Sequence, residues 1–171
     1  MHFSRGAGDN PPDTTPQQVY RQVREYHDRY PEKAIVAWHS GAGPVPVLMA
    51  GGAEALMRNP SAGQGQGTTV DRTPLDAFVR EHLARSLMNM QPRDGMAGDA
   101  ENTWCLTDDR RETVLVYSLS GPSVSFTQTP RATDTGLWFD PRTGKTQPAD
   151  AVSQVMAKPT SEAWLLLLRA K

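Results

Sequence analysis

Few side chains in this sequence combine the type and the spacing that catalysis or metal binding requires. Nothing in the spacing of the histidines matches a metal-binding motif; they are His2, His27, His39 and His82. His39 follows an apolar run, residues 34–38, at a point where a strand would end and a site could form. A structural role in that loop is the alternative interpretation. We therefore predict no metal site and keep His39 as a candidate binding residue.

Nucleophiles and cofactor-binding loops are also poorly represented. Ser40 and Ser120 lack the G-x-S-x-G sequence that exposes a catalytic serine. The single cysteine, Cys105, stands between two large apolar residues and is interpreted as a small apolar residue itself. The glycine-rich segments lack the Lys-Ser/Thr pair of a phosphate-binding loop. The sequence therefore predicts no cofactor, and a lone cysteine excludes an internal disulfide.

The best candidates for ligand binding lie in residues 137–145, LWFDPRTGK. The segment reads as a strand that enters a tight turn, because its first three residues favour strands and its proline and glycine favour the turn. Trp138 would lie on the opposite strand face from Leu137 and Phe139. Its ring could stack on a sugar or on a proline-rich ridge, and packing at a domain junction is the alternative. The candidate ligand contacts of this segment are Trp138, Asp140 and Arg142.

The composition excludes several classes of partner. The 171 residues carry 18 basic and 19 acidic side chains, for a net charge of −1. Without a basic excess, we expect neither nucleic-acid binding nor an electrostatic membrane anchor. The longest apolar run, residues 164–168, is too short to cross a bilayer, and the first residues lack the apolar segment of a signal peptide. As written, the chain is expected in the cytoplasm.

The first half of the chain shows the pattern of a small α/β layer. Residues 1–14 are polar and rich in glycine and proline, which predicts a flexible arm. A capping box that begins at Thr15 predicts a helix, and the apolar residues 34–38 predict a buried parallel strand. Residues 47–57 predict a weak helix interrupted by glycine. The low-complexity segment 59–69 is expected to be a flexible excursion.

The second half predicts short antiparallel strands. A helix over residues 74–89 comes first, and the boundary between the halves is expected near residues 91–100. The expected strands are residues 103–106, 112–119, 124–127, 136–140 and 163–169. The predicted fold class is α+β, with an α/β segment over residues 15–90 followed by an antiparallel β-sandwich over residues 99–171.

A series of motifs in this half resembles a known family. In chain order they are residues 82–83, residues 90–92, Trp104-Cys105-Leu106-Thr107, Val116-Tyr117, residues 138–144 (WFDPRTG) and residues 164–168. Order and spacing are similar to those of the C-terminal β-sandwich of apiosidase-like glycoside hydrolases of bacteria, a domain labelled as collagen-binding. The match covers about residues 74–171, and WFDPRTG is its most specific element. Upstream, residues 18–24, 34–38 and 48–53 resemble the end of the family's (β/α) barrel.

The catalytic carboxylates that the resemblance implies are not found. The family's barrel strand ends in a carboxylate, whereas residues 35–40 (IVAWHS) contain none. The glutamate-containing strand that follows in the family is expected to be missing, with residues 59–69 in its place. Glu32 precedes the predicted strand and Glu54 is expected inside a helix, so surface roles are predicted for both. A complete barrel needs at least about 200 residues, so only the end of one is expected.

The resemblance therefore implies a non-catalytic accessory or glycan-binding protein, a truncated relative of these hydrolases. Two alternatives stay open: the C-terminal piece of a split glycoside hydrolase, and a purely structural interaction module. The expected ligand is a glycan or a collagen-like chain. A homodimer or a barrel partner is expected through residues 15–90, because an isolated strand leaves backbone groups unpaired at its edges. The resembled family is often secreted, in contrast to the cytoplasmic location expected from the sequence as written.

Overall fold

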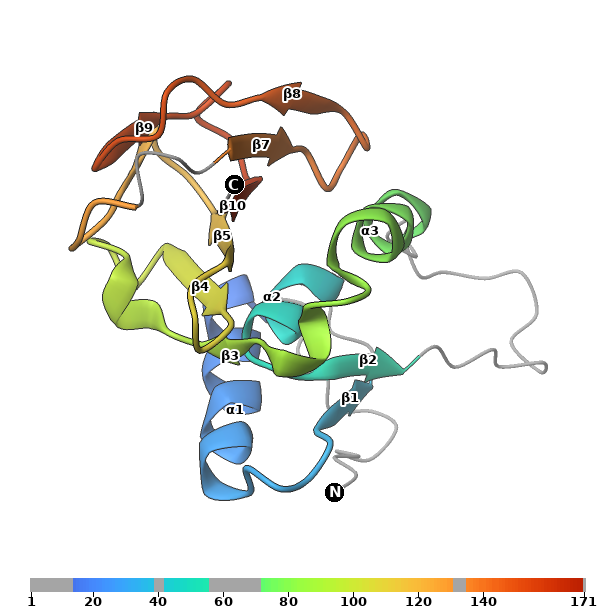
Figure 1. Ribbon diagram of the computed structural model, residues 1–171. Helices are drawn as coiled ribbons and strands as arrows, with labels where there is room; N and C mark the ends of the chain where they lie inside the picture. Colours follow the sequence, from blue (N-terminus) through green and yellow to red (C-terminus); the bar gives the residue numbers. More distant parts are fainter. Residues whose placement is uncertain (1–13, 39–41, 56–71, 131–134, 171) are drawn as a thin grey trace, which may run out of the picture. The chain divides into compact units, whose positions relative to one another are not determined.

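The structure is a computed structural model that describes residues 14–38, 42–55, 72–130 and 135–170 (Figure 1). The chain divides into two compact units, Met1–Arg72 and Thr73–Lys171. The fold class is α+β, as predicted. The described part of the first unit contains helices and a pair of parallel strands, and the described part of the second is dominated by antiparallel sheets.

The first unit follows the sequence signals closely at its start. Its described elements are α1 (Pro16–Arg29), β1 (Val36–Trp38), α2 (Pro44–Met49) and β2 (Ala53–Ala55). The Thr15 hydroxyl accepts the N–H of Gln18 at 3.3 Å, and the Gln18 side chain accepts the N–H of Thr15 at 2.9 Å. This reciprocal pair satisfies two N–H groups that a helix start would leave without acceptors, so α1 begins where the capping box predicts.

The segment after α2 differs from the prediction. A weak helix was expected over residues 47–57, but α2 ends early and β2 follows it. Gly51, in the turn between α2 and β2, has a φ of +80°, which glycine adopts without strain. The Ala53 N–H then donates to the Ile35 carbonyl at 2.9 Å, next to the parallel pairing of β2 with β1. The expectation that no strand follows the glycines is therefore wrong, and this strand carries Glu54.

Close packing explains why residue 52 is a glycine. A Cβ atom on Gly52 would lie 2.7 Å from Cγ1 of Val23 in α1 and 3.2 Å from Cγ1 of Val47 in α2. Val23, Val47 and Ile35 are all buried, so little free space remains there. The β1–α2–β2 unit therefore packs against the side of α1 that carries Val23.

The second unit is built on a large antiparallel sheet. Its described strands pair in the order β3-β4-β5-β10-β7-β8. Their bounds are β3 (Gln91–Pro92), β4 (Thr103–Thr107), β5 (Thr113–Ser118), β7 (Thr135–Phe139), β8 (Thr146–Pro148) and β10 (Trp164–Arg169). A separate pair, β6 (Ser123–Ser125) and β9 (Val155–Ala157), is also antiparallel. The five predicted strands are all present, whereas β3, β8 and β9 were not predicted.

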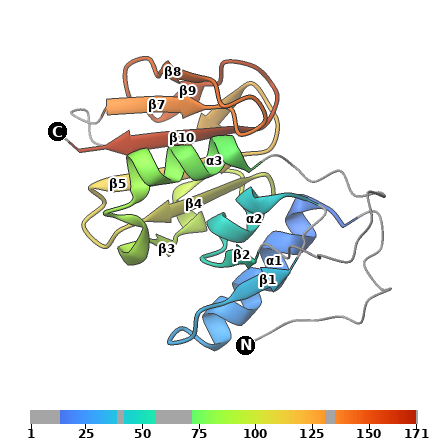
Figure 2. The same cartoon turned by 90° about the vertical axis from the view of Figure 1, so that its right-hand side faces the viewer.

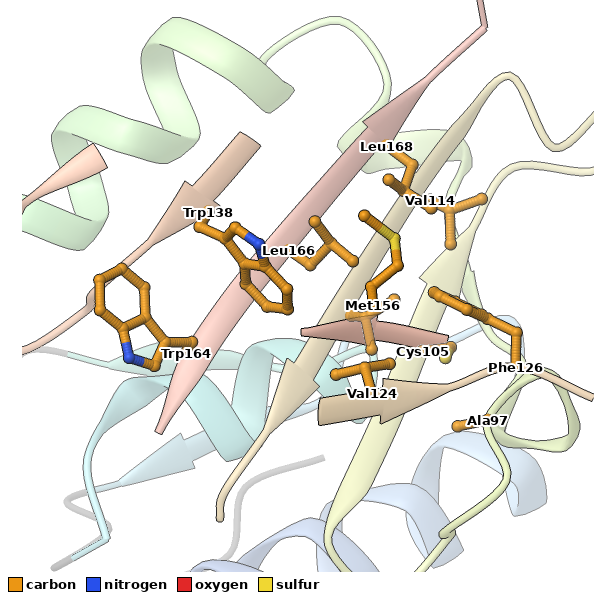
Figure 3. Close-up of a cluster of buried hydrophobic side chains, with 11 residues drawn as sticks. Ala97, Cys105, Val114, Val124, Phe126, Trp138, Met156, Trp164, Leu166 and Leu168 are labelled. Carbon is orange, nitrogen blue, oxygen red and sulfur yellow. The ribbon is translucent and has the colours of Figure 1, made fainter. Parts of the chain in front are cut away.

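One face of the large sheet carries the hydrophobic core that it shares with β6 and β9 (Figure 3). The core is formed by Ala97, Cys105, Val114, Val116, Val124, Phe126, Trp138, Met156, Trp164, Leu166 and Leu168. Cys105, Val116 and Leu166 come from three neighbouring strands and are fully buried. This packing of two antiparallel sheets agrees with the predicted sandwich.

The opposite face of the sheet is covered by helical segments of the same unit, as Figure 2 shows for α3 (Thr73–Phe78). The Phe78 ring stacks on Phe139 with 4.3 Å between the ring centroids. The π-helical turn η1 (Val79–Leu83) continues α3, and the His82 carbonyl there accepts a hydrogen bond from Arg169 of β10. The short 3₁₀ turns η2 (Leu87–Asn89) and η3 (Asp94–Met96) lead from this helix toward β4.

The boundary between the two halves lies earlier in the chain than predicted. The sequence predicts a boundary near residues 91–100, with the helix over residues 74–89 in the first part. In the structure the boundary falls after Arg72, because the apolar side of α3 and η1 packs on the large sheet. Among the described residues, no helix combines the length and apolar character needed to cross a membrane.

Candidate functional site

The structure places three of the four predicted ligand contacts in one strand and its turn, and the fourth, His39, lies outside the described residues. Trp138 lies on the opposite face of β7 from Phe139, as predicted. However, its side chain points into the core together with Leu166 and Met156 (Figure 3), and only 2 % of the residue is exposed. In this arrangement the indole ring is not accessible for stacking on a ligand.

Asp140 organises the turn between β7 and β8. Its carboxylate accepts hydrogen bonds from the Arg142 N–H at 2.9 Å, from Arg142 Nε at 3.0 Å and Nη2 at 3.1 Å, and from Thr143 Oγ1 at 3.0 Å. Burial alone would raise the pKa of Asp140, but these hydrogen bonds outweigh burial and lower it. Gly144 has a φ of +74° and donates its N–H to the Asp140 carbonyl, so the predicted turn is present. Asp140 is therefore an ionised group that stabilises the turn.

Arg142 connects this turn to the segment before β10. Its Nη1 donates to Glu162 Oε2 at 2.9 Å while its other donors contact Asp140. The hydrogen bond with Asp140 raises the pKa of the Arg142 guanidinium further. Two carboxylates thus hold this side chain, and the predicted contact residues Asp140 and Arg142 form a structural ion-pair network.

A buried lysine near the same end of the sheet gave no signal in the sequence. Lys158 Nζ donates to Ser118 Oγ at 3.2 Å and to the Ser118 carbonyl at 3.4 Å. Desolvation lowers the pKa of Lys158 to about 8, with the Arg142 charge acting in the same direction and Glu162 opposing it. The Ser118 hydroxyl itself donates to the Ser120 carbonyl at 3.1 Å and is buried. Neither group is presented to solvent as a nucleophile–base pair would be.

The glutamate in the first unit is placed differently from the prediction. Glu54 lies on a strand and not in a helix, and only 9 % of its side chain is exposed. Arg72 Nη1 donates to Glu54 Oε2 at 3.1 Å and to the Glu54 carbonyl at 3.2 Å. The prediction of a surface role for Glu54 is therefore wrong, whereas Glu32 is exposed, as expected.

A cavity of about 310 Å³ lies beside the hairpin that connects β4 to β5. Its walls are formed by Arg93, Met96, Thr107, Asp108, Asp109 and Arg111. The sequence correctly predicts a turn at residues 108–109, but the cavity is formed by segments distant in the chain and has no local signal. The strand register places this hairpin beside the Arg169 end of β10 and the Asp140 network beside its Trp164 end.

A second cavity of about 170 Å³ shares two wall residues, Met96 and Arg111, with the first. Its other walls are formed by Val114, Phe126, Gln128, Thr129, Pro130 and Leu168. The first cavity is therefore lined by charged groups and the second largely by apolar groups. Within the described ranges, no cluster of three or more His, Cys, Asp or Glu side chains could hold a metal ion.

Comparisons with known proteins extend the fold description. No known sequence family and no curated protein matches the chain. Among solved structures, the chain is similar to a protein described as a glycoside hydrolase, with a TM-score of 0.63 and 10 % sequence identity. The similarity covers 100 % of this chain and 50 % of the other, so the chain spans about half the length of the protein it matches. The chain therefore has a distant glycoside hydrolase-like fold.

Proposed function

We propose that this protein is a non-catalytic accessory protein that binds glycans on a glycoside hydrolase-like fold. The fold similarity supports the connection to carbohydrates. The non-catalytic assignment rests on one observation: the buried carboxylates are already paired with neighbouring side chains. Glu54 is paired with Arg72, and Asp140 is held by Arg142 and Thr143.

Carboxylates that are paired in this way are poorly suited to glycoside hydrolysis. Most glycosidases use two carboxyl groups on opposite sides of the scissile bond, about 5–5.5 Å apart when the configuration is retained. One of them is an acid whose pKa is raised so that it can protonate the leaving oxygen. Asp140 has the opposite property, because its hydrogen bonds lower its pKa. Its oxygens face Arg142 and Thr143 and contribute to the structure of the turn.

A second candidate function is one part of a two-part glycoside hydrolase. Two observations favour it: the chain matches half of the hydrolase, and β1 and β2 are parallel strands that flank α2. Such strand–helix–strand units are the repeating element of (β/α) barrels. On this alternative, the proposed homodimer or barrel partner would pair with β1 or β2 within residues 15–90.

A binding and hydrolysis screen separates the two candidates. The full chain is incubated with neutral and acidic oligosaccharides and with a collagen-like Pro-Hyp-Gly peptide, and both binding and new reducing ends are measured. Glycan binding without hydrolysis is the expected result. Hydrolysis by the chain alone, lost in Glu54→Gln or Asp140→Asn, would refute the non-catalytic assignment. Hydrolysis that appears only with a separately expressed barrel would favour the two-part enzyme.

A further inference from the structure

We infer that the two cavities beside the β4–β5 hairpin form the glycan site and that its ligand is a neutral sugar. The inference rests on the proposed function and specifies where and what the protein binds. The larger cavity, about 310 Å³, falls at the lower end of the range of small-ligand sites, roughly 300–1,000 Å³. The smaller one shares the wall residues Met96 and Arg111 with it.

The charges around the larger cavity balance. Two guanidinium groups, Arg93 and Arg111, and two carboxylates, Asp108 and Asp109, contribute to its walls. A sugar hydroxyl both donates and accepts hydrogen bonds, so a neutral ligand with neighbouring hydroxyls can use donors and acceptors of this wall together. An acidic ligand would meet the two carboxylates, and a basic one the two guanidinium groups. The balance therefore favours a neutral ligand.

These charged groups can accept a ligand without losing strong contacts. Arg93 Nη2 lies 3.6 Å from Asp109 Oδ1, and the two side chains are 59 % and 87 % exposed. An exposed ion pair of this kind contributes little stability, so a hydroxyl can enter it easily. Asp108 is already fixed, because its oxygens accept the N–H groups of Glu112 at 3.0 Å and Thr113 at 2.8 Å. A carboxylate retains further acceptor positions beyond two such bonds.

Arg111 is the charged side chain that lines both cavities. Its φ of +56° makes it the single non-glycine residue with a positive φ in the described ranges. Hairpin turns usually place Gly or Asn in this conformation, and strained residues of other types gather at binding sites. Its Nη1 donates to Gln128 Oε1 at 3.0 Å, and no described carboxylate pairs with its guanidinium. Several of its five N–H donors therefore remain for ligand oxygens.

The smaller cavity supplies the apolar surface that a sugar ring requires. Phe126, Pro130 and Leu168 contribute to its walls. The C–H groups of a pyranose ring can contact such a surface while its hydroxyls point toward the charged wall. A charged wall beside an apolar wall is the usual design of a small-molecule site, in which a few polar groups fix the orientation.

The test is calorimetric titration of the full chain with cello- and xylo-oligosaccharides, a polygalacturonate oligosaccharide and a collagen-like Pro-Hyp-Gly peptide. The key variant is Arg111→Gly, because glycine suits a positive φ and the variant should fold at least as well as the wild type. Arg85→Ala, an exposed arginine outside both cavities, is the matched control. Circular dichroism and urea unfolding report folding of each variant independently of binding.

We expect a neutral oligosaccharide to bind the wild type and Arg85→Ala equally. Arg111→Gly should weaken binding by about tenfold or more, since it removes charge-assisted hydrogen bonds, without lowering the urea midpoint. Equal binding by wild type and Arg111→Gly would overturn the site while leaving the proposed function intact. Binding of only the acidic oligosaccharide or the peptide would overturn the ligand class. Binding of none of them would instead refute the proposed function.

Discussion

The buried ammonium group of Lys158 gives the fold a pH dependence that one substitution should remove. Lys158 is 8 % exposed. Within the described residues, its Nζ donates hydrogen bonds only to Ser118. Desolvation lowers its pKa from 10.5 to about 8. Below about pH 8 the folded protein therefore contains a charged group that would be better hydrated in the unfolded chain.

The sign and the size of the effect follow from proton linkage. Between about pH 8 and pH 10.5, folded Lys158 releases its proton while the unfolded chain retains it, so the free energy of unfolding rises with pH. One pKa unit corresponds to about 1.36 kcal/mol, which gives an increase of up to about 2–3 kcal/mol between pH 7 and pH 10. Lys158→Met lacks the titrating group and should lack this increase.

The assay is urea unfolding of the wild type and Lys158→Met at a series of pH values. Subtracting the two curves removes the groups that titrate identically in both proteins. Lys145→Met, at an exposed position in the β7–β8 turn, is the matched control and should keep the wild-type pH dependence. A wild-type-minus-variant difference that stays constant from pH 7 to pH 10 would show that Lys158 is not desolvated, and the reasoning would fail.

Three further substitutions test separate parts of the structure. Asp140→Ala removes the acceptor of the Arg142 and Thr143 hydrogen bonds and should lower stability by about 1.5–3 kcal/mol in urea unfolding; an unchanged midpoint would refute the structural role of Asp140. Gly52→Ala places a methyl group 2.7 Å from Val23, and a loss of about 1–3 kcal/mol is expected; unaltered thermal unfolding would contradict the packing of the first unit. Burial raises the pKa of Tyr117 to about 12, so the free energy of unfolding should fall between about pH 10 and pH 12. Tyr117→Phe should abolish that fall in an unfolding series extended to about pH 12, and an equal fall in both proteins would contradict the burial of this hydroxyl.

Local signals account for the parts of the fold that were predicted correctly. The capping box at Thr15 lies within one helical turn, so the sequence predicts the start of α1. The alternation of Trp138 and Phe139 predicts that they lie on opposite faces of β7. The sequence left open whether Trp138 packs in the interior or faces a ligand, because its burial depends on β6 and β9, which are distant in the chain.

The missed features depend on contacts between distant segments. The strand β2 is short and follows two glycines, and pairing with β1 rather than local preference makes it a strand. Lys158 follows β9 and is buried next to Ser118, a residue 40 positions away in the chain, so no local pattern could predict its burial. The cavity at Arg111 combines Arg93 and Met96, at the two ends of the η3 turn, with residues of the β4–β5 hairpin. Candidate site residues therefore could not be found from one contiguous motif.

Proton NMR of a neutral oligosaccharide mixed with the full chain tests the central claim most directly, because one spectrum reports both binding and cleavage. We predict saturation transfer from the protein to the sugar protons and no new reducing-end signals during prolonged incubation. New reducing-end signals produced by the chain alone, or no saturation transfer with any neutral oligosaccharide, would contradict a non-catalytic glycan-binding protein.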